Sequence, residues 1–290
     1  WLACAIGLLS GCAGPVLRGT GDLGVIIERA SGSVQIVDST RRVAIANVQG
    51  LGDLSHASVV YSRDCRYGYV FGRDGGLTQV DLLGQRVVKR VLQAGNSIGG
   101  AVSQDGTLIA VSNYEPGGIK VFRSSDLTLV ADLPAVGDDG KRSKVVGLVD
   151  LPGQRFAYSL FEAGEVWVAD LSGATPTLQK FPRAGKEPYD GLVTGDGRWY
   201  VAGLFGEDGI AVVDLWHPEN GARKVLPEWG QGDAKLPVYK MPHLEGWAVS
   251  SGLMFVPGVG HHEVWVVRVD TWEVVKRIPL HGQPVFAVAN

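Results

Sequence analysis

The sequence predicts an all-β fold, a β-propeller built from four-stranded blades. Three observations lead to this class: one short motif recurs along the chain, turn residues separate alternating apolar runs, and helical periodicity is scarce. Four short strands in about 44 residues are typical of a propeller blade. The chain shows no alternation of strands and helices, which argues against a doubly wound sheet.

The recurring motif is an alternating apolar stretch that follows a glycine or polar turn and ends near an aspartate. Its six copies lie at 32–38, 76–81, 118–122, 164–170, 209–214 and 263–270. The last interval is longer than the others and contains an insertion around Trp229 to Leu244. Each copy is expected to be one strand of a blade, so about six blades are predicted.

A second strand is predicted before these copies, because a turn and another apolar run precede them. Asp105-Gly106 comes before 108–112, Asp196-Gly197 comes before 199–203, and residues 63–66 come before 67–71. Asp-Gly between alternating apolar runs is a strong hairpin signal, since glycine accepts positive φ without steric cost. The chain stops inside a strand-like run at 285–290, from which we expect a truncated propeller.

Composition excludes several classes of protein. The 290 residues include 45% apolar and 20% charged residues, which is enough apolar material for a large core and argues against disorder. The net charge is −3, so a nucleic-acid partner is not expected. A run of about 20 apolar residues is absent from the sequence, and we therefore expect no transmembrane helix.

The N-terminal residues indicate export. The chain starts with Trp1 rather than Met, and residues 1–11 are interpreted as the remnant of a signal peptide. Residues 9–12, Leu-Ser-Gly-Cys, resemble a bacterial lipobox, so Cys12 is expected to be lipidated and 12–20 to be the lipid anchor and linker before a propeller at 21–290. The alternative is a signal peptide with an incidental cysteine. Ala13, directly after the cysteine, favours sorting of the lipoprotein to the outer membrane, where it would face the periplasm.

Several common chemistries lack their motifs. The sequence has no Cys-x-x-Cys-His, no phosphate-binding loop, no Gly-x-Ser-x-Gly and no His-Glu-x-x-His. Covalent c-type haem and NAD are therefore not expected. The adjacent His261 and His262 are interpreted as a loop pair rather than a metal site.

Two histidines and four basic residues are candidate binding groups. His56 and His243 lie where innermost strands are expected to begin, at the rim of the central channel. The basic residues also fall near blade entries, and guanidinium groups suit carboxylates; they are Arg29, Arg73, Arg142 and Lys144. Each has a structural alternative, as a polar channel lining or as a surface charge in a turn.

Several of these segments, taken together, resemble the haem d1 propeller superfamily. They are residues 25–29, 56–58, 69–75, 188–191 and 242–243. The superfamily includes the d1 domain of cytochrome cd1 nitrite reductase and proteins that make haem d1, and the resemblance is greatest to its biosynthetic NirF branch. It implies an eight-bladed propeller with a tetrapyrrole in the central cavity, of which about two blades would be missing here.

The resemblance also implies roles for residues. His56 would be the axial ligand of the haem iron, and Arg29 and Arg73 would contact the acidic side chains of the macrocycle. Arg142 or Lys144 would act similarly. His243 resembles a distal histidine of the reductase. Asn113 and Tyr114 complete the expected set of cofactor-binding residues.

Two departures separate the chain from the reductase. Tyr189 stands where a second distal histidine is expected, and Gly246 stands where the reductase has an arginine. A c-type haem domain, which the reductase needs, is also not expected, because the segment before the propeller is interpreted as a signal sequence. These differences favour the biosynthetic branch, in which Tyr189, Asp190 and His243 would be catalytic groups that move protons.

The expected function is therefore haem d1 biosynthesis for the assembly of nitrite reductase. The protein would bind haem d1 or a precursor and take part in a late conversion, and an oxidoreductase or dehydrogenase-like reaction would need an external electron acceptor. A non-catalytic haem d1 carrier and a pigment-free interaction propeller are the alternatives. Expected partners are the tetrapyrrole, other haem d1 biosynthesis proteins, nitrite reductase and, through the lipid, a membrane.

Overall fold

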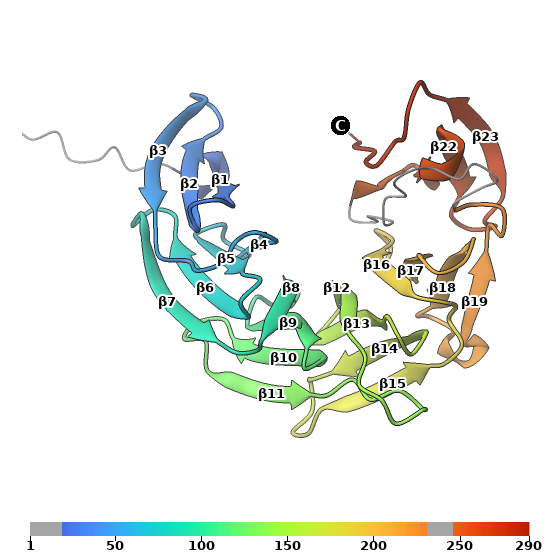
Figure 1. The fold of residues 1–290 in the computed structure, drawn as a ribbon, viewed down its shortest axis with the longest axis horizontal. Helices are drawn as coiled ribbons and strands as arrows, with labels where there is room; N and C mark the ends of the chain where they lie inside the picture. Colours follow the sequence, from blue (N-terminus) through green and yellow to red (C-terminus); the bar gives the residue numbers. More distant parts are fainter. Residues whose placement is uncertain (1–18, 231–245, 290) are drawn as a thin grey trace, which may run out of the picture.

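The described part of the chain forms six antiparallel β-sheets arranged in an arc around a central hollow (Figure 1). The computed structural model describes residues 19–230 and 246–289. The all-β prediction is confirmed, since the described helices are short 3-10 turns: η1 (Thr20–Asp22), η2 (Pro218–Asn220) and η4 (Val259–His261). None of the helices in these two ranges is long and apolar enough to cross a membrane.

Consecutive strands make each sheet. The strands are β1 (Leu23–Glu28), β2 (Ser33–Asp38) and β3 (Val43–Val48) in the first sheet; β4 (Ser58–Tyr61), β5 (Tyr67–Phe71), β6 (Gly76–Asp81) and β7 (Arg86–Leu92) in the second; β8 (Asn96–Val102), β9 (Leu108–Glu115), β10 (Gly118–Arg123) and β11 (Leu129–Leu133) in the third; β12 (Val145–Leu151), β13 (Arg155–Leu160), β14 (Glu165–Asp170) and β15 (Thr177–Phe181) in the fourth; β16 (Pro188–Val193), β17 (Trp199–Leu204), β18 (Ile210–Asp214) and β19 (Ala222–Val225) in the fifth; and β20 (Ala248–Ser250), β21 (Leu253–Gly258), β22 (Glu263–Arg268) and β23 (Val274–Pro279) in the sixth.

The repeat predicted these blades correctly. Its six copies coincide with β2, β6, β10, β14, β18 and β22, one in each sheet. In the second to fifth sheets the first strand lies nearest the hollow and the fourth lies at the periphery (Figure 1). The first sheet has three strands among the described residues, whereas four were expected.

Apolar side chains fill the space between neighbouring sheets. Five clusters of buried residues occupy the five junctions of the arc, from the first and second sheets to the fifth and sixth. The junction of the last two sheets holds five tryptophans, including Trp229 and Trp247, whose ring centroids are 5.2 Å apart. Alternating apolar residues thus bury both faces of the inner sheets, as expected for stacked blades.

Antiparallel pairing defines two rims. In the second to sixth sheets, the beginning of the first strand and the turn between the second and third strands lie on one side, which we call the upper rim. The three strands of the first sheet correspond to the second, third and fourth strands of the others, so its β1–β2 turn also lies on this rim. The turns between first and second strands lie on the opposite, lower rim. Three of these lower turns share one structure: a Ser or Thr hydroxyl donates to the aspartate two residues later, at 2.6 Å in Ser62–Asp64, 2.5 Å in Ser103–Asp105 and 2.6 Å in Thr194–Asp196.

The prediction of a strand at 285–290 is wrong, because residues 285–289 have no regular structure and Val288 is 89% exposed. Without a neighbouring strand to complete the ladder, an apolar alternating run does not form a strand by itself. Cys12 and His243 lie outside the described residues.

Candidate functional site

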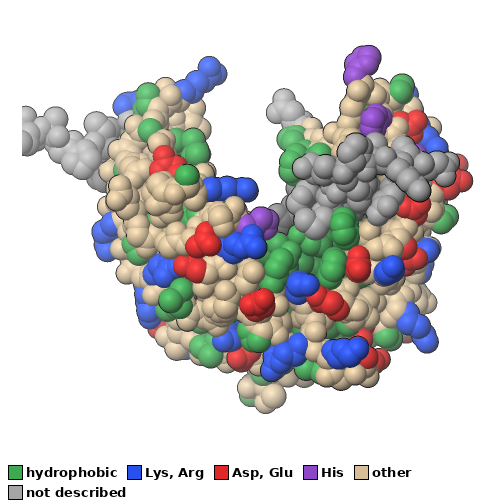
Figure 2. Space-filling model, viewed as in Figure 1, with side chains coloured by type: hydrophobic (Ala, Val, Ile, Leu, Met, Phe, Trp, Pro, Cys, Tyr) green, Lys and Arg blue, Asp and Glu red, His purple; other side chains and the backbone are tan. Residues whose placement is uncertain are grey.

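A cavity of about 170 Å³ lies where the first strands of four sheets face the hollow. His56 and Ser58 come from the second sheet, Gly99 from β8, Gly147 from β12, and Tyr189 and Asp190 from β16. These residues are far apart in the sequence, and only the closing arc brings them together. On this side of the molecule, Figure 2 shows Lys, Arg and His side chains beside a hydrophobic patch at the base of the hollow.

One side of the cavity is basic. His56 precedes β4 and is half-buried, and Arg29 and Arg73 lie in the upper-rim turns that follow β1 and β5. Burial, then the charges of Arg29 and Arg73, lower the pKa of His56 below its usual value. Its imidazole is therefore neutral at neutral pH, which is the form that binds a metal ion.

The Arg73 turn is anchored to the chain before His56. The Arg73 backbone N–H donates to the Asp53 carbonyl oxygen over 2.8 Å, and Asp74 pairs with Arg90 of β7. The Arg73 charge contributes to lowering the pKa of Asp53, after hydrogen bonds from Ser55. Arg73 is itself exposed, so its guanidinium stands at the rim above the cavity.

The other side is aromatic. The hydroxyl oxygens of Tyr114, at the end of β9, and Tyr189 are 2.9 Å apart in a hydrogen bond. Phe161 meets the Tyr189 ring nearly edge-on, with centroids 5.9 Å apart, and Phe205 lies 6.5 Å from it. Burial, together with the Asp190 carboxylate, raises the pKa of both tyrosines, so both phenols are neutral at physiological pH.

The groups in and around the cavity suit an acidic ligand with an apolar edge. A Cβ atom added to Gly99 would stand 3.3 Å from the Ser58 hydroxyl and 3.9 Å from the Ser112 hydroxyl, so this part of the wall has little room for a side chain. Arginines at one edge can neutralise carboxylates, aromatic rings at the other can contact an apolar edge, and an imidazole lies between them.

Three predicted cofactor-binding residues are placed differently. Lys144 forms an ion pair with Glu162 and lies 5.3 Å from the Phe161 ring centroid, so its charge is already compensated. Asn113 is buried, and its amide exchanges two hydrogen bonds with Gln93. Arg142 is exposed at a β-bridge with Val136. None of these three lines the cavity, and neither do Arg29, Arg73 and Tyr114; what distinguishes the two arginines is that their charges act on His56.

Sequence reasoning missed Phe161, Phe205 and Gly99. Phe161 and Phe205 directly follow the second strands of their sheets, and Arg29 follows β1, the corresponding strand of the first sheet. Aligning the six repeats by strand would have placed all these residues on one rim. Gly99 carried no such signal, because Ile98-Gly99-Gly100 resembles any glycine-containing strand.

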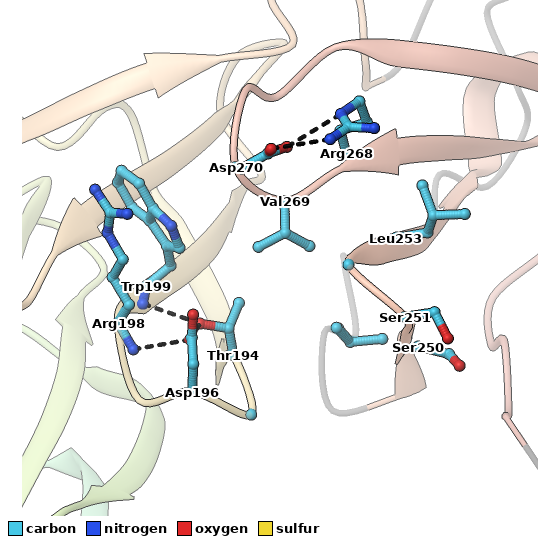
Figure 3. A pocket seen from close by; sticks show the side chains of 13 residues that line it. Thr194, Asp196, Arg198, Trp199, Ser250, Ser251, Leu253, Arg268, Val269 and Asp270 are labelled. Carbon is cyan, nitrogen blue, oxygen red and sulfur yellow. Dashed lines mark hydrogen bonds and ion pairs between the residues drawn. The ribbon is translucent and has the colours of Figure 1, made fainter.

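A second pocket, of about 470 Å³, lies on the lower rim between the fifth and sixth sheets (Figure 3). Its two arginines are engaged by neighbouring carboxylates: Arg198 with Asp214 at 2.7 Å and Arg268 with Asp270 at 3.0 Å. It is larger than the upper cavity, but compensated charges make it a poor site for an acidic ligand. The upper cavity is therefore the candidate site.

An arc of antiparallel blades with a histidine, two arginines and an aromatic wall around its hollow is the arrangement of a propeller suited to an acidic ligand with an apolar edge. The chain belongs to the family described as the cytochrome D1 heme domain, whose model matches residues 18–290.

Similar proteins agree with this assignment. The chain is 63% identical to Protein NirF of Pseudomonas aeruginosa over 98% of this chain and 73% of that protein. It is 58% identical to Protein NirF of Stutzerimonas stutzeri over all of this chain and 75% of that protein. The solved structure of dihydro-heme d1 dehydrogenase NirN in complex with DHE superposes with a TM-score of 0.77 at 25% identity, covering 93% of this chain and 56% of that one.

Proposed function

We propose that this protein takes part in haem d1 biosynthesis by binding a late tetrapyrrole precursor in the upper cavity. The observation that carries the proposal is the convergence of His56, kept neutral by burial and by Arg29 and Arg73, with an aromatic wall on the opposite side. The family assignment and the similarity to NirF and NirN support a haem d1-type ligand.

Different residues would hold different parts of the ligand. The His56 imidazole would hold the iron, and Arg29 and Arg73 would neutralise carboxylates at the rim. Phe161 and Phe205, which belong to the aromatic wall, would contact the apolar edge of the macrocycle. The bound iron macrocycle would supply the electron chemistry, while the protein supplies position and protons.

Tyr189 and Asp190 favour a role in conversion over storage alone. Both line the cavity, and a neutral phenol beside a carboxylate can give and take back a proton. His243 is proposed as a third such group on the basis of its place in the sequence. Product analysis after incubation with the precursor separates the two roles, because a carrier returns the pigment unaltered.

The test of binding is an absorption titration of the full chain with dihydro-haem d1. A saturable spectrum that differs from the free pigment is expected, and His56→Ala should shift it by removing the iron ligand. His217→Ala is the matched control, since His217 is exposed in a turn between β18 and β19, away from the cavity. A spectrum identical to that of the free pigment contradicts the proposal.

We further propose that the protein is a periplasmic lipoprotein anchored through Cys12, with other haem d1 biosynthesis proteins and nitrite reductase as partners. The lipobox-like residues 9–12 support this proposal. Membrane fractionation of cells that carry the full-length gene tests it. The wild-type protein should sediment with outer membranes, and Cys12→Ser should release it; equal sedimentation of both proteins argues against lipidation.

A further inference from the structure

One arginine on the lower rim joins the lower ends of three strands that line the upper cavity. Arg63 lies in the turn after β4. Its Nε donates to the Ser103 carbonyl oxygen over 3.0 Å, and its Nη2 donates to the carbonyl oxygen of Val102, the last residue of β8, over 2.5 Å. The same Nη2 forms an ion pair of 2.8 Å with Asp150 of β12. A single guanidinium therefore connects the ends of β4, β8 and β12.

The Arg63 side chain reaches the fourth sheet by crossing the third. A Cβ atom added to Gly106, in the lower turn of the third sheet, would stand 3.1 Å from Arg63 Cγ. Gln104, which occupies in that turn the position that Arg63 occupies in the turn before it, also donates to Asp150. Side chains from two successive lower turns thus converge on one carboxylate, and they join sheets that are not neighbours in the arc.

The strands joined in this way are weakly held by their own sheets where they line the cavity. Residues 98–100 of β8 and 146–148 of β12 line it. The pairing register shifts between Ser97 and Gly99 in β8 and between Val146 and Val149 in β12, and such a bulge interrupts the ladder. A strand rises about 3.3 Å per residue, so the Arg63 contacts lie only about 7 Å from these segments.

The Arg63 contacts amount to more than a surface ion pair. The side chains of Arg63 and Asp150 are 46% and 27% exposed, and an exposed pair alone contributes little. A guanidinium, however, presents several donors in one rigid plane, and here it serves two carbonyl groups and a carboxylate at once. The plane therefore fixes the three acceptors relative to one another.

We propose that Arg63 is a positioning residue for the upper cavity: by tying the ends of β8 and β12 to the turn after β4, it sets the spacing of the strands that surround the ligand. The inference rests on the proposed function for the identity of that ligand. Arg63 does not touch the ligand, and it acts through Asp150 and the end of β8.

The affinity for dihydro-haem d1, measured by absorption titration, tests the proposal. Arg63→Gln should weaken binding about fivefold or more, because small displacements of the lining strands misplace the groups that hold the ligand. The matched control is Arg66→Gln in the same turn, whose ion pair with Asp81 stays within the second sheet. It should change the affinity less than twofold. If Arg63→Gln is less stable to urea but binds as tightly as wild type, the role of Arg63 is only structural and the proposal is overturned.

A double-mutant cycle tests whether Arg63 acts through Asp150. Asp150→Asn should weaken binding in the wild-type background, because the carboxylate charge is lost. In the Arg63→Gln background the same change should alter the affinity less than twofold, since the shared contact is already gone. Losses that multiply in the double variant would show that the two residues act independently and would contradict the proposal.

A measurement without pigment separates this inference from the proposed function. Amide hydrogen exchange in residues 98–100 and 146–148 should be faster in Arg63→Gln than in wild type and unchanged in Arg66→Gln, because only the first variant releases these strands. Unchanged exchange in Arg63→Gln overturns the proposal whether or not pigment binds. Failure of the wild-type chain to bind dihydro-haem d1 contradicts the proposed function instead.

Discussion

At the scale of single residues, the site depends on which charges are left uncompensated. Lys144 is neutralised by Glu162, whereas the charges of Arg29 and Arg73 act on His56. Basic residues at equally plausible positions thus differ in their electrostatic role according to their neighbours. For His56 the consequence is a neutral imidazole whose protonation is opposed both by burial and by two cations.

The first prediction concerns the pKa of His56. Arg73→Ala should raise it, because one of the two cations that disfavour the imidazolium is removed. A titration followed by NMR of the histidine ring protons measures the change. Arg155→Ala removes an arginine of the fourth sheet that does not contribute to the lowered pKa of His56, and it should leave the midpoint where it is. An unchanged midpoint in Arg73→Ala would show that Arg73 does not act on His56.

The second prediction concerns the cavity wall. Gly99→Leu should reduce affinity for dihydro-haem d1 at least about tenfold, because the new side chain occupies the space beside Ser58 and Ser112. The free energy of unfolding should fall by about 1–3 kcal/mol, because the new side chain meets Ser58 closely. Gly173→Leu, in the turn after β14 with the nearest atom 3.6 Å from its added Cβ, is the control. Full affinity in Gly99→Leu would place the ligand elsewhere.

At the scale of elements, two side-chain arrangements recur in the sheets. Trp167 and Trp265, both on third strands, donate to the glutamate two residues earlier, at 2.6 Å and 3.0 Å. On the adjacent outer strand a cation covers each ring: Lys180 lies 4.1 Å from the Trp167 centroid, and Arg277 lies 4.0 Å from that of Trp265. A basic residue on the outer strand thus shields each indole from water.

The second recurring arrangement is the lower-rim turn with a Ser or Thr two residues before an Asp. In the fifth sheet, Asp196 accepts from the Thr194 hydroxyl and from the Arg198 backbone N–H, at 2.6 and 3.1 Å. The turn in the second sheet places Cys65 at φ +56°, where the equivalent residues Gly106 and Gly197 have φ of +75° and +72°. Side-chain hydrogen bonds therefore maintain the turn even without the glycine.

The third prediction concerns stability and pH. Asp196→Ala should lower the free energy of unfolding by about 1–2 kcal/mol at neutral pH, through loss of its two hydrogen bonds. These bonds, first that from Thr194, lower the pKa of Asp196, so its contribution is present above the unfolded-state pKa and is lost as pH falls through the folded-state value. Urea unfolding at several pH values measures it, and wild type and variant should converge in acid.

A suitable control for this experiment is Asp132→Ala. Asp132 is exposed and forms a long ion pair of 3.7 Å with Lys120, so its loss should change stability by about 0.5 kcal/mol or less. If Asp196→Ala costs no more than Asp132→Ala, or if the difference persists in acid, the turn does not depend on the carboxylate.

At the scale of the whole molecule, the arc depends on close approach of the inner strands. A Cβ on Gly191 of β16 would stand 2.4 Å from the Tyr200 hydroxyl oxygen and 2.9 Å from the Gly147 carbonyl oxygen of β12. Tyr200 is fully buried and donates to that same carbonyl over 2.8 Å. Glycines therefore allow β12 and β16 to meet beside the cavity.

The fourth prediction follows from this junction. Gly191→Ala should destabilise the protein by about 2–3 kcal/mol, because overpacking a rigid core shifts backbone and side chains. It should also weaken pigment binding, since Asp190 and Tyr189 precede the displaced residue. Adding Tyr200→Phe removes the atom that the new methyl group meets first and should recover part of the stability. No destabilisation in Gly191→Ala would mean that the inner strands have room to separate.

Most of the architecture was predictable because it is encoded locally. A two-residue alternation and turn residues repeat with a nearly constant period, so each blade carries its own signal. The histidine and arginines at the cavity were found for a similar reason, since strand ends and turns are visible in sequence. The expected strand at 285–290 failed because strand formation there lacked a neighbouring ladder.

By itself the sequence determined the class of fold, the order of the strands and the presence of His56, Arg29 and Arg73 at one rim. Only the tertiary structure decided that Lys144 and Asn113 are occupied by other partners, that Phe161 and Phe205 support Tyr189, and that Tyr114 reaches it across an intervening sheet. The physical reason is that backbone pattern depends on neighbours in the chain, whereas charge compensation and ring contacts depend on residues that meet only when the blades close around the axis.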